Sequence, residues 1–158
     1  MSVLSFFTWC EDSAIGEAIR SSRWLFPAIE SFHLLGLALM GGAVLLVNLS
    51  LLGFGIGRKS AAQLWRDTRP WLVASLAVNI VSGVLLFTSE AVKLYYHEAF
   101  WVKMISLALA ILYTFTVLRK VALSDAERVS PLRSKAAALI SIFLWSAVGA
   151  GGRWIGFS

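Results

Sequence analysis

The stretch Leu25–Gly53 reads LFPAIESFHLLGLALMGGAVLLVNLSLLG, a long apolar run with one acidic residue, one histidine and no lysine or arginine. A transmembrane helix needs about 20 mostly apolar residues, with a range of roughly 17–25. Three later stretches also meet this requirement: Trp71–Ser89, Phe100–Leu118 and Ala136–Gly152. Backbone polar groups cannot stay unpaired in hydrocarbon, so each stretch must be helical. The sequence therefore predicts an all-α integral membrane protein with four transmembrane helices.

The composition indicates a single membrane domain spanning residues 1–158. Hydrophobic residues make up 58% of the chain and charged residues 15%, which excludes a disordered protein. The single cysteine, Cys10, excludes an internal disulfide and a multi-cysteine metal site. The net charge of +5 does not indicate nucleic-acid binding, because the basic residues gather in two connections between the predicted spans.

These two connections, residues 54–70 and 119–135, decide the predicted orientation. They hold nine of the fourteen Lys and Arg residues: Arg58, Lys59, Arg66, Arg69, Arg119, Lys120, Arg128, Arg133 and Lys135. Three acids accompany them: Asp67, Asp125 and Glu127. Because cytoplasmic loops concentrate Lys and Arg, we expect an antiparallel bundle with both loops in the cytoplasm and both termini outside. Pro70 is expected just before the second span and Pro131 inside the second loop.

The N-terminal segment, residues 1–23, does not have the charge pattern expected of a secretion signal. Within residues 13–22, apolar residues alternate with Glu17 and Arg20 at helical spacing. This pattern, with several aromatic residues before it, favours a short amphipathic helix lying in the outer face of the membrane. A partly ordered tail is the alternative interpretation.

Ionisable residues near the outer ends of the spans form one predicted layer: Glu30, His33, Glu90, Lys103 and Arg153. Such residues are costly inside a membrane, and they usually pair with one another or serve a function. One interpretation is an ion-pair ring, made by the two carboxylates and the two cations, that holds the helices together. A protein built this way is a structural subunit that binds no cofactor.

His33 also favours a cofactor site. It follows Glu30 by three residues, so both side chains share a helix face, which continues through Gly36. Haem b requires an axial imidazole, often two, an apolar slot and cations near its propionates. We expect His33 to be one ligand, with His97, the other histidine of the chain, as a candidate second ligand. The predicted slot residues are Gly36, Phe32, Phe100 and Trp101, and the predicted propionate partners are Lys103, Arg153, Arg20 or Arg23.

A copper site is the second hypothesis for the same region. The two histidines form a soft N/S ligand set with three further residues, Met40, Met104 and Cys10, and such a set suits copper(I). A proton relay through Glu30, His33 and Glu90 is a further possibility, and its polar candidates deeper in the membrane are Asn48, Asn79, Ser75 and Ser82. We expect these four side chains to form interhelical hydrogen bonds instead.

Three sequence features carry a family resemblance: ESFHLLG at Glu30–Gly36, GRWI at Gly152–Ile155, and Lys103 near the start of the third span. With these features the chain resembles an uncharacterised family of bacterial four-helix inner-membrane proteins, a domain of unknown function. More distantly it is similar to copper-resistance protein D and to cytochrome b561-type bundles, whose functional groups are histidines on the helices. The resemblance implies a multi-pass protein of the bacterial inner membrane with both termini in the periplasm.

The chain departs from that family pattern at two places. It has Asn48-Leu49-Ser50 where Asp-Leu-Arg is expected, and His97 falls where the family does not require a histidine. The ligand assignment therefore depends first on His33.

The combined prediction is a small b-type cytochrome that binds haem near the outer leaflet and transfers electrons. Whether it is an enzyme is left open. Small-residue faces at Ala136–Ala138 and Gly149–Gly152 favour a homo-oligomer in the lipid bilayer. A periplasmic redox partner is also expected. Copper handling and a structural role in an oligomer are the two alternatives.

Overall fold

The computed structural model describes residues 2–55, 59–124 and 130–156, and every regular element within these ranges is helical. The elements are α1 (Val3–Glu11), α2 (Ala14–Ser21), α3 (Leu25–Leu52), α4 (Ala61–Ser89), α5 (Ala91–Tyr95), α6 (Glu98–Tyr113), η1 (Thr114–Leu118), α7 (Arg119–Leu123) and α8 (Pro131–Ile155). Four helical segments are long and apolar enough to cross a membrane: Leu25–Leu52, Ala61–Ser89, Glu98–Leu123 and Pro131–Ile155. The prediction of a multi-pass, all-helical membrane protein is confirmed.

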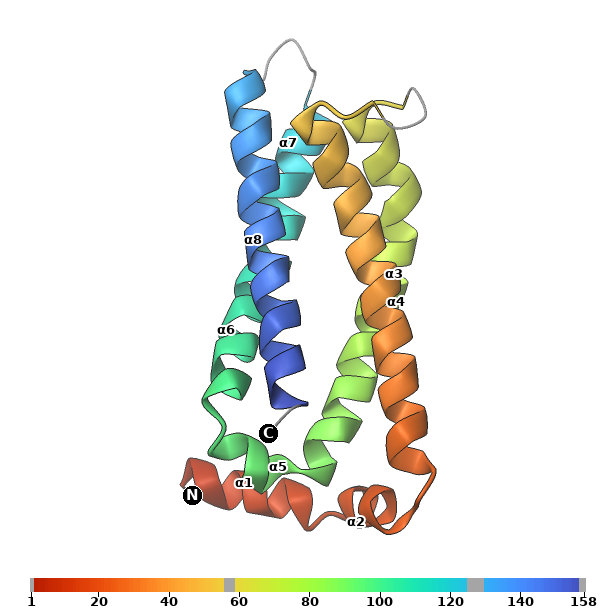
Figure 1. Cartoon of the computed structure of the whole chain (residues 1–158), viewed down its shortest axis with the longest axis vertical. Helices are drawn as coiled ribbons and strands as arrows, with labels where there is room; N and C mark the ends of the chain where they lie inside the picture. Colours follow the sequence, from red (N-terminus) through yellow and green to blue (C-terminus); the bar gives the residue numbers. More distant parts are fainter. Residues whose placement is uncertain (1, 56–58, 125–129, 157–158) are drawn as a thin grey trace.

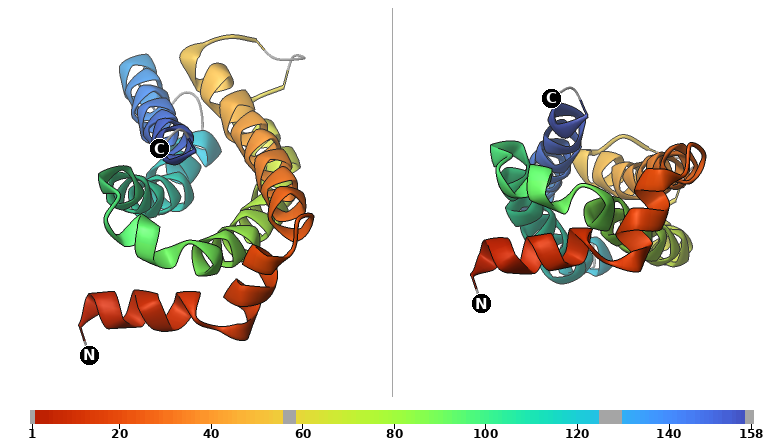
Figure 2. Two further views of the ribbon diagram at one scale, coloured as in Figure 1. Left: turned by 60° about the horizontal axis from the view of Figure 1, so that its bottom comes forward. Right: turned by 90° about the horizontal axis from the view of Figure 1, so that it is seen from below.

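The four long segments stand side by side, and the short helices α1, α2 and α5 lie across one end of them (Figure 1). Seen from that end, α1 and α2 cross in front of the long helices (Figure 2). We call this end the α1–α2 end. The last turn of α8 lies at the same end (Figure 1). Helix α3 packs mainly against α4, α6 packs against α8, and α8 joins the two pairs through its contact with α3.

Helix α3 matches the first predicted span and ends at Gly53. The φ angle of Gly53 is +100°, a left-handed conformation that glycine adopts without steric cost. The N–H of Phe54 then donates to the Leu49 carbonyl at 3.0 Å, and that of Gly53 to the Ser50 carbonyl at 3.1 Å. These two bonds satisfy carbonyls of the last turn, as in other glycine-capped helices.

Helix α4 begins at Ala61, ahead of the predicted start at Trp71. Its N-terminus is a capping box: Ser60 Oγ accepts from the Gln63 N–H at 3.2 Å, and Gln63 Oε1 accepts from the Ser60 N–H at 2.9 Å. The prediction missed this S-x-x-Q signal. Pro70 consequently lies inside α4 and not before it. It is exposed, and its missing N–H removes one backbone hydrogen bond from the helix.

The second predicted loop, 119–135, is also shorter than expected. Helices α6, η1 and α7 follow one another without a break to Leu123. Helix α8 begins at Pro131, with Ser130 as its N-cap. A proline in the first turn lacks only an N–H that has no helical partner, so Pro131 starts a helix and does not lie in the loop. Four charged loop residues lie outside the described residues: Arg58, Asp125, Glu127 and Arg128.

Two apolar clusters hold the helices together. The main cluster comprises Met40, Ala43, Val44, Val47, Leu51, Leu64, Trp65, Leu72, Leu118, Val121, Ala122, Ala137 and Ala138. The smaller one, which we call the α1 cluster, comprises Phe7, Cys10, Ala91, Leu94 and Phe100. In α4, α6 and α8, the chain positions between these clusters carry the polar and glycine residues that form the candidate site.

Helix α1 is attached to the bundle by Phe7. The Phe7 ring lies 5.0 Å from the Phe87 ring and 5.3 Å from the Tyr95 ring, both in edge-on geometry. On the opposite side of α1, Phe6 and Trp9 are 48% and 66% exposed. Exposed aromatic residues on a helix lying across the end of a membrane bundle are typical of the interface between lipid and water.

Helix α2 is attached by a close backbone approach. A Cβ atom placed on Gly16 would lie 2.5 Å from the carbonyl oxygen of Thr88, so only glycine fits there. Arg20 donates to the Ser89 carbonyl at 3.3 Å, and the Glu11 carboxylate accepts from the Val92 N–H. The predicted amphipathic helix is therefore present as α2, preceded by the additional helix α1. Both are packed against the bundle, and the alternative of a partly ordered tail is wrong.

Small polar residues recur every seventh position on the buried face of α4: Thr68, Ser75, Ser82 and Ser89. Each hydroxyl donates to a carbonyl of its own helix, on Leu64, Leu72, Val78 and Leu86 respectively. Asn79 Nδ2 likewise donates to the Ser75 carbonyl at 2.9 Å. The expected interhelical bonds of Ser75 and Asn79 are therefore wrong.

Asn48 does make its expected interhelical bond. Its Nδ2 donates to Ser141 Oγ of α8 at 3.1 Å.

Candidate functional site

His33 faces α4 from within α3. Its Nδ1 atom lies 2.8 Å from Ser82 Oγ. A Cβ atom placed on Gly83 would lie 3.4 Å from His33 Cε1, so the ring lies against a position of α4 that has no side chain. The imidazole is half-buried. The structure thus brings the predicted ligand to a neighbouring helix, where its Nδ1 is occupied by Ser82.

Lys103 of α6 lies against two glycines of α8. A Cβ atom on Gly151 would be 3.1 Å from Lys103 Cβ, and one on Gly152 would be 3.6 Å from Lys103 Nζ. The side chain is half-buried, and it is close enough to His33 for a Coulombic interaction between the two side chains. Within residues 2–55, 59–124 and 130–156, no carboxylate lies within salt-bridge distance of its ammonium group. A cation and an imidazole from opposite helix pairs therefore share one region of the bundle.

Gly36 has a different role from the predicted one. It is buried, and a Cβ atom there would lie 2.9 Å from Asn79 Nδ2 of α4. The space in front of Gly36 is therefore filled by the Asn79 side chain. Gly36 allows the close approach of α4 at this position.

The predicted ion-pair ring is not formed by the described residues. Glu90 is the C-cap of α4, and its carboxylate lies 3.9 Å from Lys93 Nζ, three residues later. Glu30 is exposed on α3 and has no salt bridge within the described part of the chain. Arg153 is exposed in the last turn of α8. Between the described residues of the predicted layer, the structure shows an electrostatic interaction of His33 with Lys103.

His97 is the N-cap residue of α6, at the junction with α5. Its side chain makes no capping bond, and its Nδ1 atom is buried without a partner among the described residues. No hydrogen bond in the described part of the chain joins His97 to His33. The structure therefore does not pair the two histidines directly.

The predicted aromatic slot is divided between two places. Phe100 is buried in the α1 cluster, with its ring 6.1 Å from Phe7. Trp101 donates to the Tyr95 carbonyl at 3.0 Å at that same end. Phe32 is 64% exposed on α3. The prediction of one slot lined by Phe32, Phe100 and Trp101 is therefore wrong.

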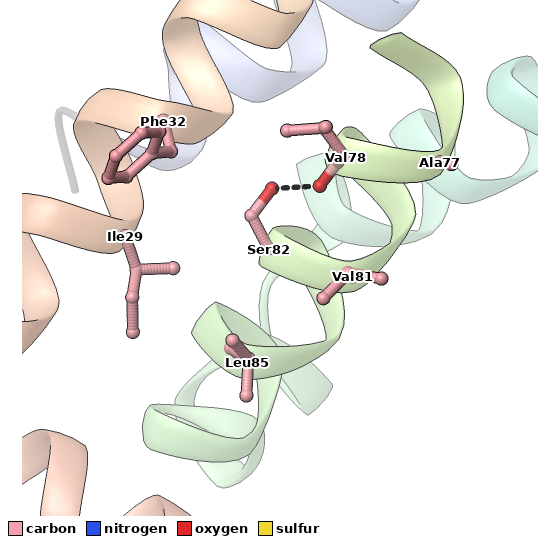
Figure 3. Close-up of a pocket in the computed structure, with 7 residues that line it drawn as sticks. All are labelled: Ile29, Phe32, Ala77, Val78, Val81, Ser82 and Leu85. Atoms are coloured by element: carbon pink, nitrogen blue, oxygen red, sulfur yellow. Dashed lines mark hydrogen bonds between the residues drawn. The ribbon is translucent and has the colours of Figure 1, made fainter. Parts of the chain in front are cut away.

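Phe32 belongs to an apolar groove between α3 and α4. The groove has a volume of about 410 Å³ and is lined by Ile29, Phe32, Ala77, Val78, Val81, Ser82 and Leu85. Figure 3 shows Ile29 and Phe32 facing α4 across it, with the Ser82 hydroxyl directed at Val78. Because Ser82 also contacts His33, the groove and the imidazole meet at this serine.

The soft ligands proposed for copper lie in separate environments. Met40 is buried in the main cluster and Cys10 in the α1 cluster, while Met104 is 44% exposed. Over the described residues, no group of three or more His, Cys, Asp or Glu side chains is placed to hold a metal ion. The described residues therefore do not bring the soft N/S ligand set proposed for copper together.

The fold and this site define a multi-pass helical membrane protein in which two half-buried residues, His33 of α3 and Lys103 of α6, lie close enough for an electrostatic interaction. The chain belongs to the family described as "Family of unknown function (DUF6644)", whose model matches residues 6–158. No curated protein matches the sequence, and no solved structure matches it.

Proposed function

We propose that this protein is a small membrane cytochrome that binds haem b through His33 and transfers electrons. The observation that carries the proposal is the geometry of His33. Its Nδ1 is held by Ser82 on the neighbouring helix, which leaves Nε2 as the ring nitrogen available to iron. Histidine ligands in proteins commonly engage their second nitrogen in such a hydrogen bond, which orients the ring. A bound haem b supplies a reversible one-electron iron couple.

Lys103 supports the same proposal. A cation inside a membrane segment is costly unless it is paired, and no carboxylate of the described residues pairs with it. Haem propionates are anions that require a cation. Lys103, beside Gly151 and Gly152, is therefore proposed to neutralise a propionate, with Arg153, the next residue of α8, as a second candidate.

The groove between α3 and α4 supplies apolar surface next to His33. Its volume of about 410 Å³ is within the usual size of small-molecule and cofactor sites, roughly 300–1,000 Å³. A porphyrin is largely apolar, so Ile29, Phe32 and Val81 provide surface of the right chemistry. His97 is proposed as the second ligand, and its buried Nδ1 has no hydrogen-bond partner among the described residues.

The visible spectrum of detergent-purified protein tests this proposal. A Soret band with reduced α-bands at b-type positions is expected in the wild-type protein and in Gly42→Ala, which changes an open position on the same helix. Both features should be lost in His33→Ala, and Lys103→Met should lower the haem content. Full haem content in His33→Ala contradicts the ligand assignment. Bound copper without a Soret band favours copper handling. The absence of both the Soret band and bound copper favours a structural subunit.

We also propose that the helices cross a bacterial inner membrane antiparallel, with the α1–α2 end in the periplasm. The basic residues of the described loops and helix ends lie at the other end of α4, α7 and α8: Lys59, Arg66, Arg69, Arg119, Lys120, Arg133 and Lys135. This charge distribution favours that end as the cytoplasmic one. A reporter that is active only outside the cytoplasm, fused after residue 158, should be active, and the same reporter inserted after Ser60 should be inactive.

A homo-oligomer stays part of the proposal, but its contact surface changes. Ala137, Ala138 and Gly151 are buried within the chain, so they do not offer a face to another copy. Gly149, by contrast, has open space around its Cα. Exposed apolar residues of α8, including Phe143 at 72%, face lipid or a second protomer. Cross-linking in membranes through Gly149→Cys measures this directly. The proposed electron-transfer partner docks on the periplasmic end.

A further inference from the structure

The Ser82 hydroxyl has a single proton, and three atoms lie within hydrogen-bond distance of its oxygen: His33 Nδ1 and the carbonyl oxygens of Val78 and Asn79. Its Oγ atom lies 2.6 Å from the Val78 carbonyl oxygen and 2.8 Å from His33 Nδ1. A carbonyl oxygen only accepts hydrogen bonds, whereas an imidazole nitrogen donates or accepts according to its tautomer. The direction of the Ser82 hydroxyl therefore decides which nitrogen of His33 carries the proton.

The rest of α4 shows which direction this hydroxyl takes. Thr68, Ser75 and Ser89, at the same heptad position, all donate to a carbonyl of their own helix. The Ser82–Val78 distance is the shortest of the four, at 2.6 Å. If Ser82 donates to Val78, its oxygen must accept from His33, so Nδ1 carries the proton.

A second carbonyl agrees with this assignment. Ser82 Oγ also lies 3.4 Å from the Asn79 carbonyl oxygen, which only accepts. The hydroxyl proton is therefore directed toward carbonyls of its own helix, and the Ser82 oxygen accepts from a protonated Nδ1. Next to Ser82 on α4, Gly83 provides a contact surface without a side chain, which lets the imidazole lie in this position.

We infer that Ser82 is a positioning residue that holds His33 as the Nδ1–H tautomer, so that the lone pair of Nε2 points away from α4 as the ligand atom. This inference rests on the proposed function only for its consequence in haem binding. The tautomer itself is a property of the protein without haem. It is therefore measurable whether or not haem binds.

Nitrogen-15 NMR tests the inference. The full-length protein is labelled at its histidines and measured in lipid bilayers. The chain has two histidines, and His97→Gln identifies the signals of His33. We expect a protonated Nδ1 and a bare Nε2 in the wild-type protein. In Ser82→Ala the ratio of the two tautomers should change by about fivefold, the usual effect of one hydrogen bond.

Ser75→Ala is the matched control. Ser75 is 2% exposed and Ser82 5%, and both donate to their own helix, but the hydrogen-bond partner of His33 Nδ1 is Ser82. The control should leave the tautomer ratio unchanged. Ser82→Thr keeps a hydroxyl, as Thr68 does in the same heptad position, and should restore the Nδ1–H form. A bare Nδ1 in the wild-type protein, or equal ratios in Ser82→Ala and Ser75→Ala, overturns the inference.

Haem titration separates this inference from the proposed function. If haem binds, Ser82→Ala should weaken its affinity about ten- to hundredfold, as for other residues that orient metal ligands, and Ser75→Ala should not. If the NMR result holds but the purified protein takes up no haem, the proposed function fails and the role of Ser82 stands. If haem binds but the tautomer does not respond to Ser82→Ala, the role of Ser82 fails and the proposed function stands.

Discussion

Gly36 of α3 lies directly against the side-chain amide of Asn79 of α4, with space for a hydrogen atom but not for a methyl group. A Cβ atom at position 36 would lie 2.9 Å from Asn79 Nδ2 and 3.2 Å from its Cγ. The Asn79 side chain is held in place because its Nδ2 donates to the Ser75 carbonyl of the same helix. The contact between α3 and α4 beside His33 therefore depends on the absence of a side chain at Gly36.

Gly36→Ala should consequently lower the free energy of unfolding by about 1–3 kcal/mol, the usual cost of overpacking a buried contact. Gly42→Ala, on the same helix with nothing within 4 Å of the added Cβ, should have little effect. Unfolding in mixed detergent micelles measures both. Asn79→Ala combined with Gly36→Ala should recover part of the loss, because the clashing amide is removed. Equal stability of the two glycine variants contradicts the contact.

The N-terminal helix α2 offers a second test. Gly16→Ala places a Cβ 2.5 Å from the Thr88 carbonyl and 2.7 Å from the Glu11 carbonyl, and neither backbone atom moves easily. We expect α2 to lose its contact with α4, so that residues 2–21 become cleavable by protease and exchange amide hydrogens faster. Ala18→Ser, at an exposed position of the same helix, should leave both measurements unchanged. Unaltered protection in Gly16→Ala would argue against this docking.

Phe7 and Phe6 form a matched pair on α1. Phe7 is 6% exposed within the α1 cluster, whereas Phe6 is 48% exposed. Phe7→Ala should weaken the packing of α1 against the bundle by about 3–5 kcal/mol, as for other buried phenylalanines. Phe6→Ala should cost much less in detergent. Hydrogen exchange along residues 2–11 reports the difference, and similar exchange in the two variants would refute the assignment of Phe7 as the anchor.

Asn48 and Ser141 form a buried polar contact between α3 and α8, with both side chains 1% exposed. A double-mutant cycle with Asn48→Ala and Ser141→Ala should give a coupling energy of about 0.6 kcal/mol, the average for such bonds inside membrane proteins. Unfolding free energies of the four proteins provide the cycle. Strict additivity of the two substitutions would mean that the bond contributes nothing.

Removal of the Lys103 charge should raise the stability of the haem-free protein but lower its haem binding. Without a ligand, Lys103→Met removes a charge that has no carboxylate partner among the described residues, and it should stabilise the protein by about 1–3 kcal/mol. Its haem content should fall, because a propionate loses its cation. Lys93→Met, which removes an exposed lysine paired with Glu90, is the control and should change neither quantity appreciably. A destabilised Lys103→Met protein would show that Lys103 already has a partner.

Much of the fold was predictable because it depends on local, additive properties. The run of apolar residues from Leu25 to Leu52 is long enough to cross a membrane by itself, and Gly53 marks its end. The early start of α4 was also encoded, in the capping box of Ser60 and Gln63. Hydrophobicity alone misses such a start because the first turns of α4 are polar.

The site was predicted only in part. His33 and Lys103 were expected at one depth, and they do interact. Their partners were not predicted. The heptad spacing of Ser75, Ser82 and Ser89 was visible in the sequence, and it would have indicated a buried serine face on α4. It would not have indicated which of these serines meets His33.

The amino-acid sequence by itself determined that four helices cross a membrane, and which side chains fall at similar depths on them. These properties follow from residue type and helical rise, which are the same in any environment. Only the tertiary structure decided that His33 turns toward Ser82, that Asn79 fills the space before Gly36, and that Lys103 lies on Gly151. Such contacts depend on how far each helix is rotated about its own axis, and that rotation is set by side chains of neighbouring helices packing against one another.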